Sequence, residues 1–367
     1  MRRAILPALL LLVALAVPAA AQGRIVRHAG FESRLLANER DVWVYLPAGY
    51  DLGSARYPVL YLDDGNNMFD PSAPFGGWRL QGTLDRMIAA GEMRAVIAVA
   101  VSNTPDRIYE YTPTEDEEYG GGGGGTYLRF LIEELKPFVD RTYRTERGAG
   151  STGILGSSLG GLQAFHAAWT RWDVFGLSGA MSPSFWWDDR FLLREVQRFS
   201  GTPPRARFYL DSGDQGPSRD GKADTEAMRD ALAAKGYEFG KTLSHWLDRG
   251  AAHNEIAWAG RVGRALAFLF PPGTPAPGSA TTRIRVHFDV GWGHRIALRG
   301  GAPGWGSWRN EIRTSWNPGN VWVYETTAIK AGTIFEFKAL VDGASWESGP
   351  NHVARGGETT DVFPRFP

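Results

Sequence analysis

A pentapeptide near the middle of the chain carries a serine in the setting that a nucleophilic hydroxyl requires. Gly156-Ser-Ser-Leu-Gly160 has the spacing G-x-S-x-G, with Ser158 at its centre. Between a strand and a helix this spacing makes a sharp turn, because the small flanking residues let the backbone pass close to its neighbours while the serine hydroxyl projects outward. An apolar stretch, 153–155, precedes the motif, and a run of small and apolar residues, 161–165, follows it. The pattern predicts that Ser158 is a nucleophile; the alternative is an ordinary Gly-Ser turn.

A serine nucleophile needs a base to take its proton, and a histidine oriented by a carboxylate is the usual device. Of the seven histidines, His253 lies in a loop, 249–254, between a late strand and a long helical segment. His245 falls inside a strand pattern, which is more typical of a packed or surface side chain. We therefore predict His253 as the base. The other histidines at a useful distance after the serine, His287, His294 and His352, lie beyond a proline-rich stretch.

The carboxylate partner should follow the serine and precede the histidine in the chain. The loop after the strand that ends at Asp211 offers two aspartates, Asp214 and Asp220. Asp211 itself belongs to the strand, and Asp224 resembles a cap for the helix that follows. We favour Asp220 and keep Asp214 as the alternative acid, and either one could instead be a turn-forming aspartate.

Hydrolysis through such a serine also needs backbone donors for the oxyanion that forms. The N–H of Leu159, at the start of a helix, would be one donor. The second is expected from the loop Asp63-Asp-Gly-Asn-Asn67, through Gly65 or Asn66. Losing one donor of this kind costs on the order of 10²–10³ in rate. Chemistry of this kind calls for no metal and no cofactor, and we expect neither.

The elements that would position these residues alternate between short apolar strands and longer helical periods. Such alternation predicts an α/β fold with a mostly parallel sheet covered on both faces. Strands are expected over 41–47, 58–62, 95–101, 153–155 and 207–211, and helices near 79–90, 127–141, 161–170, 223–236 and 255–269. The five consecutive glycines at 121–125 are expected to form a mobile loop rather than regular structure.

A change in composition divides the chain. Residues 271–279 are rich in proline and glycine and predict a semi-stiff linker. Beyond them no helical period is found, and 283–290, 321–324 and 334–340 have the pattern of strands separated by Gly, Pro and Asn turns. We expect a hydrolase-like domain over 23–270 and a β-sandwich over 280–367.

The N-terminus has the pattern of a secretory signal peptide. Arg2 and Arg3 are followed by an apolar stretch, 5–17, and by small residues, 18–21. The apolar stretch is shorter than the roughly 20 residues that span a bilayer. We expect residues 1–22 to be cleaved and the mature protein to be periplasmic or secreted, without a membrane anchor, which is the alternative interpretation.

Charge and cysteine content narrow the function further. Lys plus Arg and Asp plus Glu both number 40, so no field of one sign would attract nucleic acid, and we expect no nucleic-acid partner. There is no cysteine, which excludes disulfides, thiolate catalysis and cysteine metal sites.

Several stretches together resemble the esterase family of α/β-hydrolases that includes esterase D, feruloyl esterases, enterochelin-type esterases and mycolyltransferases. They are 40–50, 57–69, 156–161, 181–187 and 253–258. The resemblance covers about 36–270 and implies the α/β-hydrolase fold and hydrolysis of carboxylic esters. It places Ser158 and His253 on the family's nucleophile and base. The acid loop is longer than in the simplest members, so Asp220 and Asp214 both stay open.

The C-terminal region is similar to starch-binding and glycogen-binding modules, which are immunoglobulin-like β-sandwiches. Trp346-Glu-Ser-Gly-Pro-Asn351 resembles their WE-x-x-PN loop, and Trp305-Gly-Ser-Trp308 falls where they keep a glycine-linked tryptophan. The resemblance implies a site for an α-glucan-type polysaccharide formed by Trp308, Lys338, Trp346, Glu347 and Asn351. The alternative is that the tryptophans fill the core of the sandwich.

These features favour an exported serine esterase that acts on an ester substrate, with acylated sugars or polysaccharides as the substrate class to consider. Two alternatives stay open. One is acyl transfer to a sugar through the same acyl-enzyme, and the other is a carbohydrate-binding protein whose hydrolase domain is an inactive scaffold. The order serine, acid, histidine counts against the scaffold.

Overall fold

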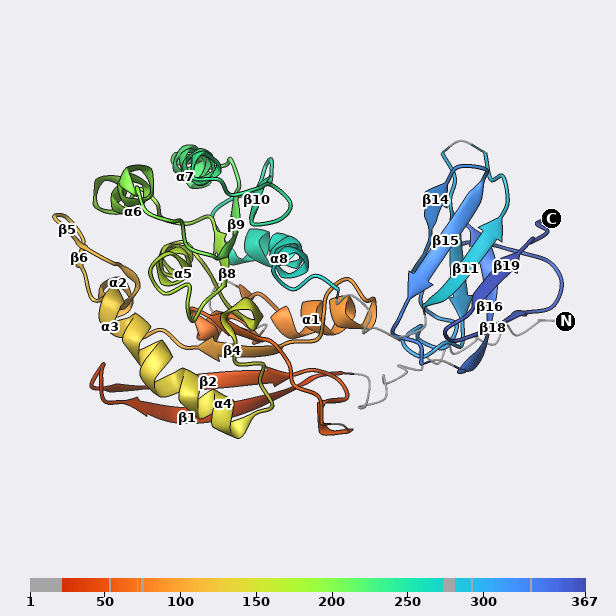
Figure 1. Cartoon of the computed structure of the whole chain (residues 1–367), viewed down its shortest axis with the longest axis horizontal. Helices are drawn as coiled ribbons and strands as arrows, with labels where there is room; N and C mark the ends of the chain where they lie inside the picture. Colours follow the sequence, from red (N-terminus) through yellow and green to blue (C-terminus); the bar gives the residue numbers. More distant parts are fainter. Residues whose placement is uncertain are drawn as a thin grey trace, which may run out of the picture.

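The computed structural model describes residues 22–52, 54–70, 72–73, 76–272, 281–291, 293–330 and 332–367. They form an α/β part and a β part (Figure 1). The last helix of the first part, α8 (Glu255–Leu269), is followed by the first strand of the second, β11 (Thr282–His287). Nearly all of the predicted signal peptide, 1–22, and most of the predicted linker, 271–279, lie outside the described residues, and those predictions remain untested.

The α/β part is built on one eight-stranded sheet with the order β1-β2-β4-β3-β7-β8-β9-β10. Strand β2 pairs antiparallel with β1 and with β4, and all other neighbours are parallel. The carboxyl ends of parallel strands meet at one edge of a sheet, where ligand sites of such folds are found. The strands are β1 (Arg24–Ser33), β2 (Asn38–Leu46), β3 (Val59–Leu62), β4 (Ile97–Val101), β7 (Thr152–Ser157), β8 (Leu177–Met181), β9 (Arg207–Ser212) and β10 (Leu243–Leu247).

Helices cover both faces of this sheet (Figure 1). On one face α1 (Leu80–Ala89) and α8 bury a cluster that includes Leu84, Trp258 and Leu266. On the other face the larger cluster includes Leu131, Phe165 and Met228. The helices of this second face are α3 (Gly124–Arg129), α4 (Lys136–Thr142), α5 (Leu159–Thr170), α6 (Trp187–Arg198) and α7 (Lys222–Ala234). A π-helical segment, Phe130–Leu135, joins α3 to α4.

The predicted strands and helices of this part correspond to elements of the structure, with shifts at their ends. The helix expected over 127–141 is one rod made of α3, the π-helical segment and α4. The elements that were not predicted include β1, β8 and α6. Strand β8, Leu-Ser-Gly-Ala-Met, is fully buried, but its serine and glycine interrupt the apolar pattern by which a buried strand is predicted. Half of β1 is exposed, so its hydrophobic pattern is weak.

The prediction that the glycine run 121–125 forms an irregular loop was wrong. Strand β5 (Glu115–Asp116) pairs with β6 (Gly120–Gly121), and α3 starts at Gly124. The run is needed for close packing. Gly121 has φ +97, and a Cβ there would collide with Thr112 and lie 2.8 Å from the ring of Trp187, while a Cβ on Gly123 would collide with the ring of Tyr109. The glycines therefore let a hairpin lie directly against α2 (Arg107–Tyr111) and α6.

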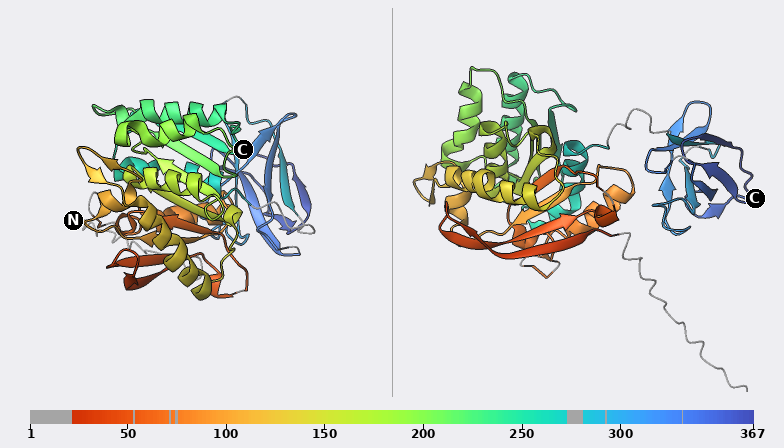
Figure 2. Two further views of the ribbon diagram at one scale, coloured as in Figure 1. Left: turned by 60° about the vertical axis from the view of Figure 1, so that its left-hand side comes forward. Right: turned by 60° about the horizontal axis from the view of Figure 1, so that its bottom comes forward.

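The C-terminal part consists of two sheets, visible as the blue strands in Figure 2. One has the order β14-β15-β11-β19, and the other has β13-β12-β16-β17 with β18 also paired to β16. They share one core, which includes Val286, Trp322, Leu298 and Phe337. This confirms a β-rich region, whereas its likeness to an immunoglobulin sandwich stays a prediction. The strands are β12 (Ile296–Gly300), β13 (Ile312–Arg313), β14 (Ser315–Asn317), β15 (Val321–Thr326), β16 (Ile334–Val341), β17 (Ser345–Trp346), β18 (His352–Arg355) and β19 (Thr359–Val362).

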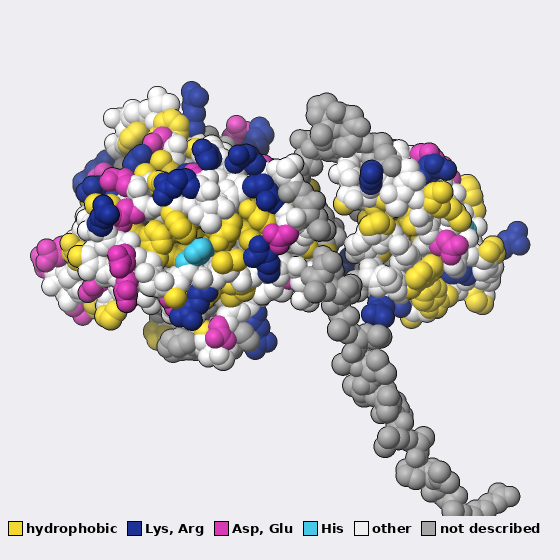
Figure 3. Space-filling model, turned by 90° about the horizontal axis from the view of Figure 1, so that it is seen from below, with side chains coloured by type: hydrophobic (Ala, Val, Ile, Leu, Met, Phe, Trp, Pro, Cys, Tyr) yellow, Lys and Arg dark blue, Asp and Glu magenta, His cyan; other side chains and the backbone are white. Residues whose placement is uncertain are grey.

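The surface carries charges of both signs. On the face shown in Figure 3, basic and acidic side chains both occur, and apolar side chains gather in a patch around a histidine of the larger part. Over the whole chain the two signs balance, with a formal net charge of +0. Within the described ranges, no helix has both the length and the apolar character needed to cross a membrane.

Candidate active site

Ser158 lies on a strained turn between β7 and α5. Its φ of 56° and ψ of −122° are unusual for a residue with a side chain, and three glycines make this conformation possible. A Cβ on Gly156 would lie 2.6 Å from the carbonyl carbon of Gly160, and one on Gly160 would lie 3.1 Å from Cβ of Asp63. A Cβ on Gly161 would lie 3.0 Å from the carbonyl oxygen of Met181. The motif glycines thus allow α5 to start directly against neighbouring backbone.

The hydroxyl of Ser158 is at the carboxyl edge of the sheet. Its Oγ lies 3.4 Å from Oγ of Ser184, and its backbone N–H donates to Met181 at 3.0 Å. Among the hydrogen bonds of the described residues, none joins Ser158 to His253. In hydrolytic enzymes this contact often forms fully only in the complex with substrate. Ser157, by contrast, is a buried residue of β7.

His253 and Asp220 are in direct contact. Nδ1 of His253 lies 2.5 Å from Oδ1 of Asp220, and the imidazole is 41% exposed while the aspartate side chain is fully buried. The ring packs edge-on against Trp258, with ring centroids 4.9 Å apart. A neutral imidazole held in this way through Nδ1 directs its Nε2 lone pair outward, as a general base requires.

The surroundings of Asp220 keep it ionised. Its other oxygen, Oδ2, accepts a hydrogen bond of 2.6 Å from Ser182 Oγ and another from the backbone N–H of Gly213. Burial on its own would raise the pKa of Asp220, but the bonds from His253, Ser182 and Gly213 together hold the pKa below its usual value. The side chain is therefore an anion at neutral pH, able to stabilise an imidazolium.

The other aspartates considered for this role are engaged elsewhere. Asp214 accepts a hydrogen bond of 2.7 Å from the backbone N–H of Gly250 and so holds the loop that carries His253. Asp224 was expected to cap a helix, but α7 begins two residues earlier, with Gly221 at its N-cap, and Asp224 pairs with Arg190 at 2.7 Å.

Asp211 is buried at the end of β9, and its Oδ1 lies 3.1 Å from Nε of Arg261. His245 lies on β10, as the strand pattern predicted.

Three residues that the sequence did not single out form a network behind Asp220. Ser182 Oγ accepts hydrogen bonds from Trp258 Nε1 at 2.9 Å and from Arg261 at 2.5 Å while it donates to Asp220. All three side chains are buried. A signal was available, because Ser182 follows β8 directly at the edge where the serine and acid loops lie.

The loop after β3 has free backbone donors. In the 3₁₀ turn Gly65–Asn67, the N–H groups of Asn67 and Met68 donate to carbonyls of the loop itself. Within the described part of the chain, neither Gly65 nor Asn66 donates its N–H to another group. Leu159 is the first residue of α5, where the backbone N–H has no partner inside the helix. Among the described residues, these three amides therefore have no hydrogen-bond partner.

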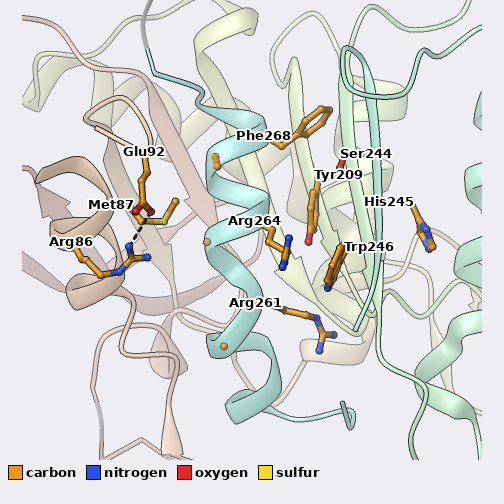
Figure 4. Close-up of a pocket in the computed structure, with 13 residues that line it drawn as sticks. Arg86, Met87, Glu92, Tyr209, Ser244, His245, Trp246, Arg261, Arg264 and Phe268 are labelled. Carbon is orange, nitrogen blue, oxygen red and sulfur yellow. Dashed lines mark hydrogen bonds and ion pairs between the residues drawn. The ribbon is translucent and has the colours of Figure 1, made fainter. Parts of the chain in front are cut away.

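A hollow of about 410 Å³ borders this loop. It is lined by Gly65 and Asn66 together with Trp43 and Phe69, and by Ile25, Arg27 and Asp70. A larger hollow of about 670 Å³ lies along α8, where Arg264 is stacked 3.6 Å above the ring of Trp246 (Figure 4). No residue of the Ser158, Asp220 and His253 set lines either hollow, so volume does not mark the candidate site.

In the C-terminal part, Trp308 and Trp346 lie side by side, with ring centroids 6.5 Å apart and planes at 30°. Trp346 is 39% exposed, whereas Trp305 is buried in the core. The polar residues are engaged with the protein. Lys338 donates to the backbone of Glu347 and Gly349, and Asn351 donates to Glu336 at 2.8 Å.

Glu347 is placed differently from what a sugar ligand would need. It is buried, accepts a bond of 2.6 Å from the N–H of Ala339 and contacts His352 at 2.8 Å. Its carboxylate holds β16 and β18 together, so we keep it as a structural residue and leave it out of the proposed sugar site.

A serine on a strained strand-to-helix turn, at the carboxyl edge of this sheet, defines the class of α/β-hydrolase-like proteins. Residues 33–264, well over half of the chain, match the family model described as Putative esterase, and the chain belongs to this family. Family membership makes the matched segment a carboxylic ester hydrolase.

Individual proteins agree with this assignment. The chain is 33% identical over 137 residues to a siderophore enterobactin esterase of Emericella nidulans, covering 32% of this chain and 45% of that protein. It is 27% identical over 244 residues to an endo-1,4-beta-xylanase/feruloyl esterase of Xylanibacter ruminicola, covering 64% of this chain and 30% of that protein. The matches thus span less than half of either relative.

A solved structure of a ferulic acid esterase is similar in fold. It has a TM-score of 0.54 and 20% identity, over 69% of this chain and 100% of that chain. At this identity the likeness concerns the fold alone, and it supports the α/β-hydrolase fold that the sequence predicted.

Proposed function

We propose that this protein hydrolyses carboxylic esters with Ser158 as nucleophile, His253 as general base and Asp220 as the orienting acid. The observation that carries the proposal is the 2.5 Å contact between His253 and Asp220, at the edge of the sheet where the strained Ser158 turn lies. Asp214 is not the acid in this proposal, because its carboxylate binds the backbone of Gly250.

The reaction would proceed through an acyl-enzyme. His253 takes the Ser158 proton as Oγ attacks the ester carbonyl, and the C=O becomes a tetrahedral C–O⁻. The N–H groups of Leu159 and of Gly65 or Asn66 would donate to this oxyanion. His253 then returns the proton to the departing alcohol. Water, deprotonated by the same imidazole, attacks the acyl-enzyme, releases the acid and restores Ser158.

The substrate class we propose is an acylated carbohydrate. In support, the relative from Xylanibacter ruminicola is named as a xylanase and feruloyl esterase. The exposed Trp346 and the half-buried Trp308 beside it offer two neighbouring rings of the kind on which sugars stack.

We also propose export to the periplasm or the medium, on the basis of the N-terminal pattern. A basic start, an apolar stretch of signal-peptide length and alanines at 19–21 support it. The absence of cysteine is compatible with export, since no disulfide is needed to hold a domain with a core of this size.

The direct test is hydrolysis of short-chain p-nitrophenyl esters by the purified mature protein, followed by a panel of acylated sugars. We expect saturable hydrolysis that Ser158→Ala abolishes. A native protein that folds but releases no p-nitrophenol, and none of the acids from the sugar esters, would favour the inactive scaffold instead.

A further inference from the structure

The residue just before the proposed oxyanion donors has a conformation that needs support. Asp64 has φ 55° and ψ 43°, in the left-handed region, and it is the N-cap of the turn Gly65–Asn67. Residues with side chains occupy this region only where their surroundings fix them. Gly65 itself is packed tightly, since a Cβ there would lie 2.5 Å from the backbone of Ala100 and Val101. The direction of the Gly65 and Asn66 amides therefore depends on how Asp64 is held.

Arg107 binds both carboxylate oxygens of Asp64. Nε of Arg107 donates to Oδ1 at 2.6 Å and one of its terminal nitrogens donates to Oδ2 at 2.8 Å. A two-pronged bond of this kind fixes orientation as well as distance. Asn103 adds a third bond to Oδ1 at 2.5 Å. The backbone N–H of Asp64 donates to the hydroxyl of Tyr111 at 2.9 Å.

The carboxylate of Asp64 also faces the nucleophile turn. A Cβ on Gly160 would lie 3.2 Å from its Oδ2, so the second glycine of the G-x-S-x-G motif leaves the space that the carboxylate occupies. Asp64 therefore lies between the two elements that would supply the oxyanion donors: the loop of Gly65 and Asn66, and the start of α5 with Leu159.

Helix α2, which carries Arg107 and Tyr111, is itself anchored. Glu110, between them, accepts bonds of 3.0 and 2.6 Å from Arg40 of β2, and both side chains are buried. One short helix thus binds the sheet through Glu110 and the loop through Arg107 and Tyr111. The Arg107 side chain is 28% exposed, and its guanidinium lies over the buried ring of Tyr111, 5.2 Å from the ring centroid.

We propose that Arg107 is a positioning residue for ester hydrolysis: by clamping Asp64, it aims the Gly65 and Asn66 amides at the oxyanion. This inference rests on the proposed function. In this proposal Arg107 does not contact the reacting atoms. Its loss should destabilise the transition state, in which the oxyanion exists, rather than weaken binding of the ester.

The test measures kcat, KM and unfolding temperature for Arg107→Ala, Arg107→Lys and Asp64→Asn. For Arg107→Ala we expect kcat/KM to fall about 10²- to 10³-fold, as when a donor is lost, with KM nearly unchanged. Lysine supplies one point charge instead of a planar fork, so Arg107→Lys should be intermediate. Guanidinium chloride, well below denaturing concentration, should restore part of the activity of Arg107→Ala. A matched control is Arg129→Ala, which removes an exposed ion pair with Glu133 and should leave kcat unchanged.

Binding of a boronic acid, which forms a tetrahedral adduct with a nucleophilic serine, gives a second readout. Its affinity should fall in parallel with kcat/KM across the Arg107 and Asp64 variants. If Arg107→Ala does not fold, the same result is expected of Asp64→Asn, which keeps the size of the side chain. Folded variants that lose less than about threefold in kcat, or that lose activity only through KM, would overturn the inference. Activity that survives Ser158→Ala would instead overturn the proposed function, and this inference with it.

Discussion

Ser182 donates a hydrogen bond of 2.6 Å to Oδ2 of Asp220, the oxygen that His253 does not touch. The same hydroxyl oxygen accepts bonds from Trp258 and Arg261. One small buried side chain therefore links the proposed triad acid to α8, the helix that follows the histidine loop. Because Ser182 has φ 39°, it is held in a conformation that only a well-packed site maintains.

We predict that Ser182→Ala lowers both activity and stability. The variant removes a donor from Asp220 and the Ser182 acceptor of Trp258 Nε1 and of one Arg261 nitrogen, although this nitrogen also lies 3.4 Å from Asp220. A buried N–H group left unsatisfied costs about 1–3 kcal/mol of unfolding free energy. The misplaced carboxylate should lower kcat about tenfold or more, a fraction of the roughly 10⁴ that loss of the acid costs. Kinetics and urea unfolding of the same preparation measure the two effects.

The matched control for that variant is Ser178→Ala on β8. Ser178 is also fully buried, and its hydroxyl donates to the carbonyl of Ala164 at 2.9 Å, away from Asp220. It should lose stability and keep kcat. Equal losses of kcat in the two variants would mean that Ser182 acts on stability alone.

Asp220→Asn should reduce kcat by about 10⁴, because the amide neither stabilises the imidazolium nor selects the productive tautomer. Asp214→Asn should cost far less, since its effect is limited to one bond to the loop at Gly250. The ratio of the two kcat values decides between the aspartates. If Asp214→Asn were the more damaging change, the loop would be rearranged in the working enzyme and Asp214 would be the acid.

The lowered pKa of Asp220 has a consequence for acid stability. A carboxyl whose pKa is lower in the folded state than its unfolded value of 3.8 stabilises the fold above that pH and loses this contribution as the pH falls through the folded-state value. Asp220→Asn has no such group. Between pH 6 and pH 3 the unfolding temperature of the native protein should therefore fall more than that of the variant. Parallel declines would contradict the assigned direction.

The tryptophan pair of the C-terminal part gives a test of polysaccharide binding. In native gels the full chain should be retarded by soluble starch or glycogen, and Trp346→Ala should migrate as if no polysaccharide were present. Because the ring is 39% exposed, its removal should leave unfolding almost unchanged, whereas truncation of a core tryptophan costs about 3–5 kcal/mol. Trp172→Ala, an exposed ring of the α/β part, is the control. No retardation of the native chain would remove the polysaccharide from the account.

The sequence was informative where chemistry and backbone geometry use the same residues. Gly156, Gly160 and Gly161 are required by the turn itself, so the motif predicted both the fold and Ser158. His253 and Asp220 could be ranked because chain order limits the choices. The choice of Asp220 over Asp214 stayed open, since both lie in one loop and only its path decides which carboxylate faces inward.

Residues that act through others left no comparable signal. Ser182, Arg261 and Arg107 are common residue types without a fixed spacing to Ser158, and strand β8 and helices α8 and α2 bring them to the site. The glycine run 121–125 shows that composition alone can also suggest the wrong local structure. Its composition suggests a loop, whereas the rings of Tyr109 and Trp187 that it makes room for are visible only in three dimensions.

The most direct test of the central claim is to label the native protein with a fluorophosphonate and map the modified residue by tandem mass spectrometry. A nucleophilic serine is phosphonylated at Oγ with loss of fluoride. The account predicts one phosphonyl group per chain, on Ser158, with ester hydrolysis lost in proportion to labelling and no labelling in Ser158→Ala. A label on Ser157 or Ser184, or full activity in a protein labelled at Ser158, would contradict it.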